Sequence, residues 1–224
     1  MKIIGHRGAA GLAPENTLAA LEAGIAAGAD ILEFDVRVTS DNIPVLSHDR
    51  FATKGQEHLL IGSNTYAQLK SCNPLIARLD EALNRIGTRA VPMIEVKAHE
   101  LTGPIVTVLK EFVGSTYTPG QVQLGSKSQR TLNALHAALP DVPKVVIEPW
   151  SGVRAVVRAR ILGTKHISMR SWWLWGGFLD AMQKRGYLMA AYTLNDPAKA
   201  RRWEKYLDAV ITDFPDRYRD TKPS

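Results

Sequence analysis

Cysteine is nearly absent from this chain, because Cys72 is the single cysteine among 224 residues. One thiol cannot form an internal disulfide, and it cannot supply the thiolate cluster of a structural zinc site. The sequence also lacks an apolar run of membrane-spanning length, and its first residues hold no signal-peptide core. We therefore expect a cytoplasmic protein with no stable membrane insertion.

The sequence has no concentrated charge of one sign. Its net charge of +6 comes from 28 Lys and Arg against 22 Asp and Glu, which are largely scattered along the chain. A scattered excess predicts weak attraction for anions such as phosphates, and no nucleic-acid-binding motif accompanies it. The first predicted strand also lacks the Gly-x-Gly-x-x-Gly turn of dinucleotide-binding folds. We expect a small-molecule partner and no nucleic acid, and the sequence leaves a homo-oligomer open.

Strand-like and helix-like segments alternate along the chain. The predicted strands cover residues 2–5, 31–38, 91–97, 122–125, 144–148, 166–169, 188–193 and 209–212. Eight such units at this length favour an α/β fold with a closed (β/α)₈ TIM barrel, formed by residues 1–224 as a single domain. An irregular segment at about 51–77 predicts a short insertion after the second strand and its hairpin, with one short helix at 65–70.

The second predicted strand places two acids on one face. Glu33, Asp35 and Arg37 share a face, and the opposite face is apolar, which suits a sheet covered by helices. The carboxylates then point into the barrel, about 7 Å apart, where they repel unless a cation lies between them. A hard divalent cation is the natural candidate. Taken alone, the stretch equally fits a surface hairpin with solvated acids.

Other chemically versatile residues also fall where predicted strands end. These residues are His6, His48, Glu95, Lys97, Glu148, Thr193, Asn195 and Asp213. In a barrel, the carboxyl ends of the strands carry the active site. Three carboxylates without thiolates suit Mg²⁺ or Ca²⁺, and nearby cations suit a phosphate ester. Two histidines on different loops suit proton transfer near neutral pH.

Several of these residues have a simpler interpretation. Lys97 could be only the salt-bridge partner of Glu95 or Asp35. Asn195 and Thr193 could cap the helix predicted over 197–206, which we favour, with Asn195 also near the pocket. Asp213 could be a turn residue. The tryptophans that follow the sixth strand fit loop packing, a subunit contact, or an apolar wall for the alcohol or acyl part of a substrate. These tryptophans are Trp172, Trp173 and Trp175.

Short motifs in a fixed order resemble those of the glycerophosphodiester phosphodiesterase family. They are His6-Arg7-Gly8, Pro14-Glu15-Asn16-Thr17, Glu33-Phe34-Asp35-Val36, His48-Asp49, Glu95-Val96-Lys97, Thr193-Leu194-Asn195 and Ile211-Thr212-Asp213-Phe214-Pro215. The resemblance spans nearly the whole chain. It departs from the family pattern at Tyr192, where Trp is usual, and at Lys127, where Phe usually follows the serine.

The resemblance implies a metal-dependent barrel enzyme that hydrolyses glycerophosphodiesters to glycerol 3-phosphate and an alcohol. It implies Glu33, Asp35 and Glu95 as metal ligands and His6 and His48 as the acid/base pair. It also implies that Arg7 and Lys97 bind the phosphate, and we add Asn195 to the expected substrate-binding residues. The alternatives are a lysophospholipase D-like phosphodiesterase on lysolipids or sphingolipids, a Mg²⁺-dependent barrel lyase, and a phosphate-binding module with a decayed site.

Overall fold

Eight parallel strands close into a barrel in the computed structural model, which describes residues 1–221. The barrel strands are β1 (Lys2–Gly5), β2 (Ile31–Val38), β6 (Val91–Val96), β7 (Gln123–Ser126), β8 (Lys144–Glu148), β9 (His166–Arg170), β10 (Leu188–Tyr192) and β11 (Ala209–Thr212). They follow the order β1-β11-β10-β9-β8-β7-β6-β2, and β1 also pairs with β2, which closes the ring. The predicted TIM barrel is confirmed.

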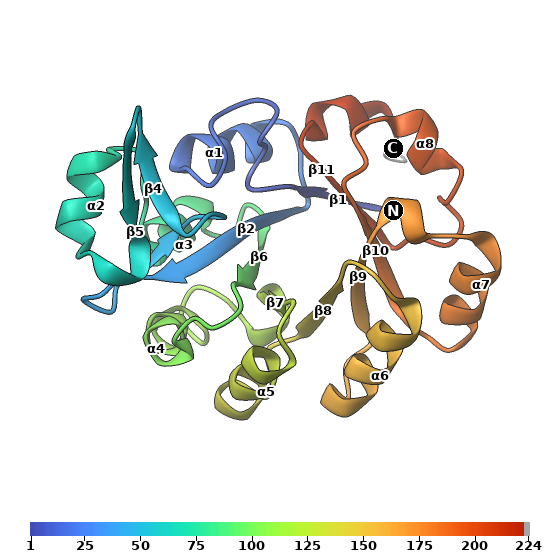
Figure 1. Cartoon of the computed structure of the whole chain (residues 1–224). Helices are drawn as coiled ribbons and strands as arrows, with labels where there is room; N and C mark the ends of the chain where they lie inside the picture. The colour runs from blue at the N-terminus through green and yellow to red at the C-terminus, as the bar shows by residue number, and fades with distance from the viewer. Residues whose placement is uncertain (222–224) are drawn as a thin grey trace.

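Helices connect the strands and surround the barrel (Figure 1). They are α1 (Leu18–Ala26), α3 (Leu79–Ile86), α4 (Thr102–Phe112), α5 (Gln129–Ala138), α6 (Gly152–Leu162), α7 (Gly176–Lys184) and α8 (Pro197–Arg201). Within residues 1–221, no helix combines the length and the apolar character needed to cross a membrane.

The segment after β2 leaves the barrel and returns to it before α3. It starts with β3 (Pro44–Leu46), which pairs antiparallel with β2, and continues with β4 (Phe51–Lys54), β5 (Glu57–Leu60) and α2 (Tyr66–Cys72). Figure 1 shows this excursion standing at one side of the barrel. The predicted short helix is present as α2. The β4–β5 hairpin was not predicted, because two strands of four residues around Gly55 show too little alternation to be recognised.

Apolar side chains alternate between the inside of the barrel and the layer beneath the helices. On β2, Leu32, Phe34 and Val36 pack outward in one large cluster with residues of α3 and α4. Ile31 belongs instead to a smaller cluster inside the barrel that includes Met93. The predicted two faces of β2 are therefore present, and Glu33 and Asp35 occupy the inner one, since residues two apart on a strand share a face.

The helix predicted over 197–206 is shorter than expected. It ends at Arg201, and Asp196 caps it by accepting a hydrogen bond from the Ala198 amide. The prediction that Thr193 or Asn195 caps this helix was wrong. Trp203 and Tyr206, which the longer helix would have included, pack against the outer core from the turns that follow. After β11, residues Pro215–Thr221 form a 3₁₀-helix.

Candidate active site

Three carboxylates meet at the carboxyl ends of two neighbouring strands. Asp35 on β2 lies directly opposite Glu95 on β6 in the parallel register, and Glu33 lies two residues earlier on the same face as Asp35. One oxygen from each of the three side chains lies within 4.8 Å of the others. All three residues are buried, with at most 6% of their surface exposed. This is the arrangement of acids that the sequence predicted.

The three acids differ in how their charge is balanced. Burial, reinforced by the negative charge of Asp35, raises the pKa of Glu33 to about 7. Burial would also raise the pKa of Asp35, but the ammonium of Lys97 outweighs it and holds that pKa below its ordinary value. Glu33 accepts a hydrogen bond of 2.9 Å from the Arg7 amide, which balances only part of its charge. The ionised form of Glu33 is therefore disfavoured in this pocket unless a further positive charge is present.

Two lysines and an arginine border the acids. The Nζ of Lys97 lies 2.8 Å from Oε1 of Glu95 and forms a second ion pair with Asp35. Lys127 reaches the same Glu95 oxygen at 2.9 Å. The Nε of Arg7 lies 3.6 Å from Asp35, and it is buried without a hydrogen-bond acceptor among the described residues. Arg7 therefore has one buried donor, close to Asp35, that makes no hydrogen bond among the described residues.

His6 is held by a chain of hydrogen bonds. Its Nδ1 lies 2.6 Å from Oδ1 of Asp213, and the other oxygen of Asp213 accepts a bond of 2.7 Å from the Asn195 amide. The Asp213 backbone amide donates in turn to Oδ1 of Asn195. Burial of the imidazole opposes its charge, but Asp213 and then Glu33 outweigh it and raise the pKa of His6. Asp213 thus fixes the ring and supports its protonated form.

His48 approaches the acids from the excursion. It borders an open hollow of about 300 Å³ whose lining also includes Glu95, Lys97 and Lys127. Its Nδ1 lies 2.8 Å from Asp49, and its side chain is about one-third exposed, at 36%. The structure therefore places His48 in the same hollow as Glu95, one of the three acids.

The loop between β1 and α1 holds Asp35 in position through hydrogen bonds. Its backbone turns through positive φ at Arg7 and Gly8, and a side chain at Gly8 would collide with the Ala20 carbonyl of α1. Asn16, also at positive φ, donates to Asp35 at 2.9 Å and accepts from the Asp35 amide at 2.9 Å. This loop therefore fixes Asp35, because the side-chain amide of Asn16 bonds to its carboxylate and to its backbone N–H.

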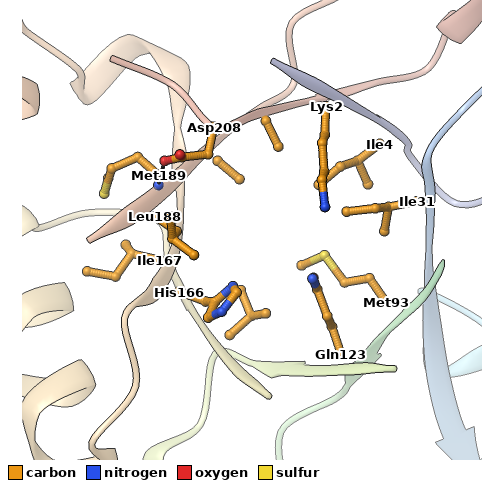
Figure 2. Close-up of a pocket in the computed structure, with 13 residues that line it drawn as sticks. Lys2, Ile4, Ile31, Met93, Gln123, His166, Ile167, Leu188, Met189 and Asp208 are labelled. Carbon is orange, nitrogen blue, oxygen red and sulfur yellow. Dashed lines mark hydrogen bonds between the residues drawn. The ribbon is translucent and has the colours of Figure 1, made fainter. Parts of the chain in front are cut away.

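A second cavity lies at the opposite end of the barrel (Figure 2). It measures about 230 Å³ and is lined by residues at or near the amino ends of the strands, including Lys2, Ile31 and His166. Its lining contains none of the predicted site residues. The amino ends of barrel strands usually serve stability, so we place the active site at the carboxyl end.

Sequence reasoning undervalued three residues that touch the site. Asp213 was placed at a strand end but could have been only a turn residue, Asn16 was noted only within the Pro14-Glu15-Asn16-Thr17 motif, and Lys127 only as a departure from the family pattern. Thr17, and not Asn16, caps α1. The Asp213 contact joins residues 207 positions apart, so no local pattern could reveal it. Asn16 and Asp213 lie within recognised motifs, and that was the one available signal for them.

Solved structures share this architecture. A phosphodiesterase of Oleispira antarctica, solved in complex with the product sn-glycerol-3-phosphate, superposes with a TM-score of 0.86 at 23% identity over 98% of this chain and 96% of that chain. A glycerophosphodiester phosphodiesterase of Thermotoga maritima superposes with a TM-score of 0.81 at 23% identity, covering 98% and 97% of the two chains. At these identities the likeness shows the fold.

Sequence comparison identifies the family. A glycerophosphodiester phosphodiesterase of Bacillus subtilis is 23% identical over 254 residues, which cover 98% of this chain and 85% of that protein. The sequence model of the glycerophosphoryl diester phosphodiesterase family matches residues 6–217. That match includes every residue predicted for the site. The chain therefore belongs to the glycerophosphoryl diester phosphodiesterase family and is a phosphoric diester hydrolase.

Proposed function

We propose that this enzyme hydrolyses glycerophosphodiesters to glycerol 3-phosphate and an alcohol, with the help of a divalent metal ion. The observation that carries the proposal is the convergence of Glu33, Asp35 and Glu95 in one buried cluster, with His6 and His48 beside it. The Oleispira antarctica relative holds sn-glycerol-3-phosphate, which supports this choice of product.

The acid cluster fits a hard divalent cation. Three carboxylate oxygens within 4.8 Å of one another form an all-oxygen donor set, which suits Mg²⁺ or Ca²⁺. A cation would favour the ionised form of Glu33, which burial and the charge of Asp35 disfavour. We propose these three residues as the metal ligands. When bound, the ion would neutralise charge on the phosphate oxygens and polarise the phosphorus.

The two histidines suit the two proton transfers. We propose that the glycerol hydroxyl next to the phosphate attacks phosphorus, and that His6 accepts its proton at Nε2, since Nδ1 faces Asp213. The bond from phosphorus to the leaving alcohol oxygen then breaks, and His48 donates the proton that this oxygen needs. Water opens the resulting cyclic phosphate, and the two histidines exchange roles.

The basic side chains suit the phosphate. We propose that Arg7 and Lys97 bind its non-bridging oxygens, because the Arg7 Nε is buried and free and the Lys97 ammonium lies between Asp35 and Glu95. Asn195 was predicted to bind substrate. Its side-chain amide donates to Asp213 and accepts from the Asp213 amide, so we propose that it acts by positioning Asp213 and, through it, His6.

A substrate panel tests the proposal. Purified enzyme would be stripped of metal with EDTA and supplied with Mg²⁺ or Ca²⁺, then offered glycerophosphocholine, glycerophosphoethanolamine, glycerophosphoinositol and lysophosphatidylcholine. We expect glycerol 3-phosphate to form from the glycerophosphodiesters only after metal is restored. Full turnover in EDTA would contradict metal dependence, and release of a product other than glycerol 3-phosphate would contradict the proposed reaction.

A further inference from the structure

An exposed aromatic group lies where β8 and β9 end. Trp150, Trp172 and Trp173 are exposed by 52%, 68% and 48% of their surface. Their rings form a chain, with centroids 6.5 Å apart between Trp150 and Trp172 and 6.0 Å apart between Trp172 and Trp173. Large aromatic rings left this exposed add little to folding, and such patches usually mark an interaction site.

An aliphatic stripe on α6 begins directly after Trp150. Val153, Val157 and Ile161 recur every four residues, so they lie along one face of the helix. They are exposed by 79%, 50% and 63%, although residues on the opposite side of α6, such as Ala155 and Ala159, are fully buried. We call the surface formed by these three residues and Trp150, Trp172 and Trp173 the α6 face.

The charged side chains of α6 itself have one sign. Helix α6 contains three arginines and no acid, and its exposed Arg154 and Arg160 flank the aliphatic stripe. The guanidinium of Arg170 lies 5.0 Å from the ring centre of Trp150 and 5.7 Å from that of Trp172. The nearby acid Glu148 is fully buried and pairs with Arg154 and Arg158. The face therefore presents apolar side chains among cations.

We propose that the α6 face binds a lipid surface that carries anionic headgroups. Tryptophan favours the boundary between water and hydrocarbon, and a basic amphipathic helix is typical of proteins that lie on membranes. The charges disfavour a second copy of the chain, because a two-fold interface opposes the same patch on both subunits and would bring the arginines together. An anionic surface instead complements them.

This surface adjoins the candidate active site. Arg170 lies opposite Tyr192 in the parallel register of β9 and β10, and both residues are the last of their strands, at the end of the barrel that holds the acids. Arg170 in turn stacks on the aromatic group. Docking would place the barrel mouth beside the lipid headgroups. This consequence for substrate supply rests on the proposed function, whereas lipid binding itself does not.

Vesicle binding tests the inference without turnover. Full-length protein would be sedimented with sucrose-loaded vesicles of phosphatidylglycerol and phosphatidylcholine, of phosphatidylcholine alone, or without vesicles. We expect binding to the anionic vesicles that weakens as salt increases. The variant Val157→Glu should weaken that binding about tenfold or more, because it adds an anion to the apolar stripe. The matched control Leu188→Glu alters an exposed apolar residue at the amino end of the barrel.

Three results would overturn the inference. One is the absence of binding to anionic vesicles by wild-type protein. Another is an equal loss of binding in Val157→Glu and Leu188→Glu, which would indicate a general charge effect. The third is a dimer in sedimentation velocity that Val157→Glu dissociates, which would identify a second copy as the occupant. Thermal melting of each variant verifies that it is folded. Because vesicle binding is measured without substrate, its result does not depend on the result of the substrate panel.

Discussion

Asp213 lies 2.6 Å from Nδ1 of His6, although 207 positions separate the two residues in the sequence. His6 is the first residue after β1 and Asp213 is the first residue after β11. These two strands pair where the chain closes the barrel. Asp213 also accepts a hydrogen bond from Asn195, so its carboxylate is held on both sides. The geometry is that of a carboxylate that orients a histidine and supports its protonated form.

Replacement of Asp213 by Asn should slow turnover with little change in KM. The substitution removes the negative charge that raises the pKa of His6, and it weakens the control of the ring orientation. We expect kcat for glycerophosphocholine to fall by about 10²-fold. The exposed Asp216→Asn is the matched control. Equal kinetics for Asp213→Asn and wild type would contradict a positioning role.

The positions of the three acids were predictable, because they follow from the alternation of side chains along single strands. Alternation along residues 31–38 put Glu33 and Asp35 on one face. Because the apolar opposite face packs against the helices of a closed barrel, the face with the two acids points inward. The position of Glu95 could also be predicted from local sequence, because it lies near the end of the next barrel strand. His6 and His48 were noticed because they follow predicted strands, and the family motif strengthened the case for His48, whose own context was ambiguous.

The remaining features depend on long-range contacts or on weak local preferences. Asp213 acquires its partner only when β11 pairs with β1. The sequence from Asn195 to Pro197 offers two polar residues as a helix cap, and the choice of Asp196 follows from the bonds that occupy Asn195. The hairpin of β4 and β5 is stabilised by packing in the excursion, where Ala52 joins a cluster with Val45 and Leu69.

Loss of one acid from the cluster should abolish both metal binding and activity. The variant Glu33→Gln keeps the shape of the side chain but removes the charge that a divalent ion would neutralise. We expect turnover to fall by about 10²-fold or more. Mg²⁺ or Ca²⁺ should raise the melting temperature of wild type and leave that of Glu33→Gln unchanged.

The variant Glu22→Gln serves as a control for this test, since Glu22 lies on α1 and pairs with Arg85 and Arg89, which are not residues of the cluster. It should keep the stabilisation by metal. A metal-induced rise in melting temperature that survives in Glu33→Gln would indicate that the ion binds elsewhere.

Glu148 should contribute stability that depends on pH. It is fully buried, and burial opposes its charge, but Arg154, the Trp150 amide and Arg158 outweigh burial and hold its pKa below the ordinary value. A depressed pKa in the folded state contributes stability above the unfolded value of about 4.3, which is lost as pH falls through the folded value. Wild-type unfolding free energy should therefore decline as the solution becomes more acidic than about pH 4.5.

The variant Glu148→Gln should remove this contribution at neutral pH. Breaking a buried ion pair by neutralising one partner leaves Arg158 buried without its counter-charge. We expect a loss of about 3 kcal/mol, which corresponds to a melting temperature lower by about 6–12 °C in a chain of this size. Denaturant unfolding at several pH values measures both effects. An unchanged pH profile in the variant would show that Glu148 carries no such linkage.

The proposed roles of His6 as base and His48 as acid predict that the two alanine variants respond differently to a change of leaving group. A general acid matters most when the departing alcohol is a poor leaving group, whereas a base that activates the nucleophile is needed for every substrate. Replacement of His48 by Ala should therefore slow hydrolysis of glycerophosphocholine about 10²-fold or more, and slow release of p-nitrophenol from a glycerol p-nitrophenyl phosphodiester far less. His6→Ala should slow both reactions to a similar extent. His58→Ala, at an exposed position on β5, is the matched control. If His48→Ala impaired both substrates equally while His6→Ala spared the p-nitrophenyl ester, the two assignments would have to be exchanged.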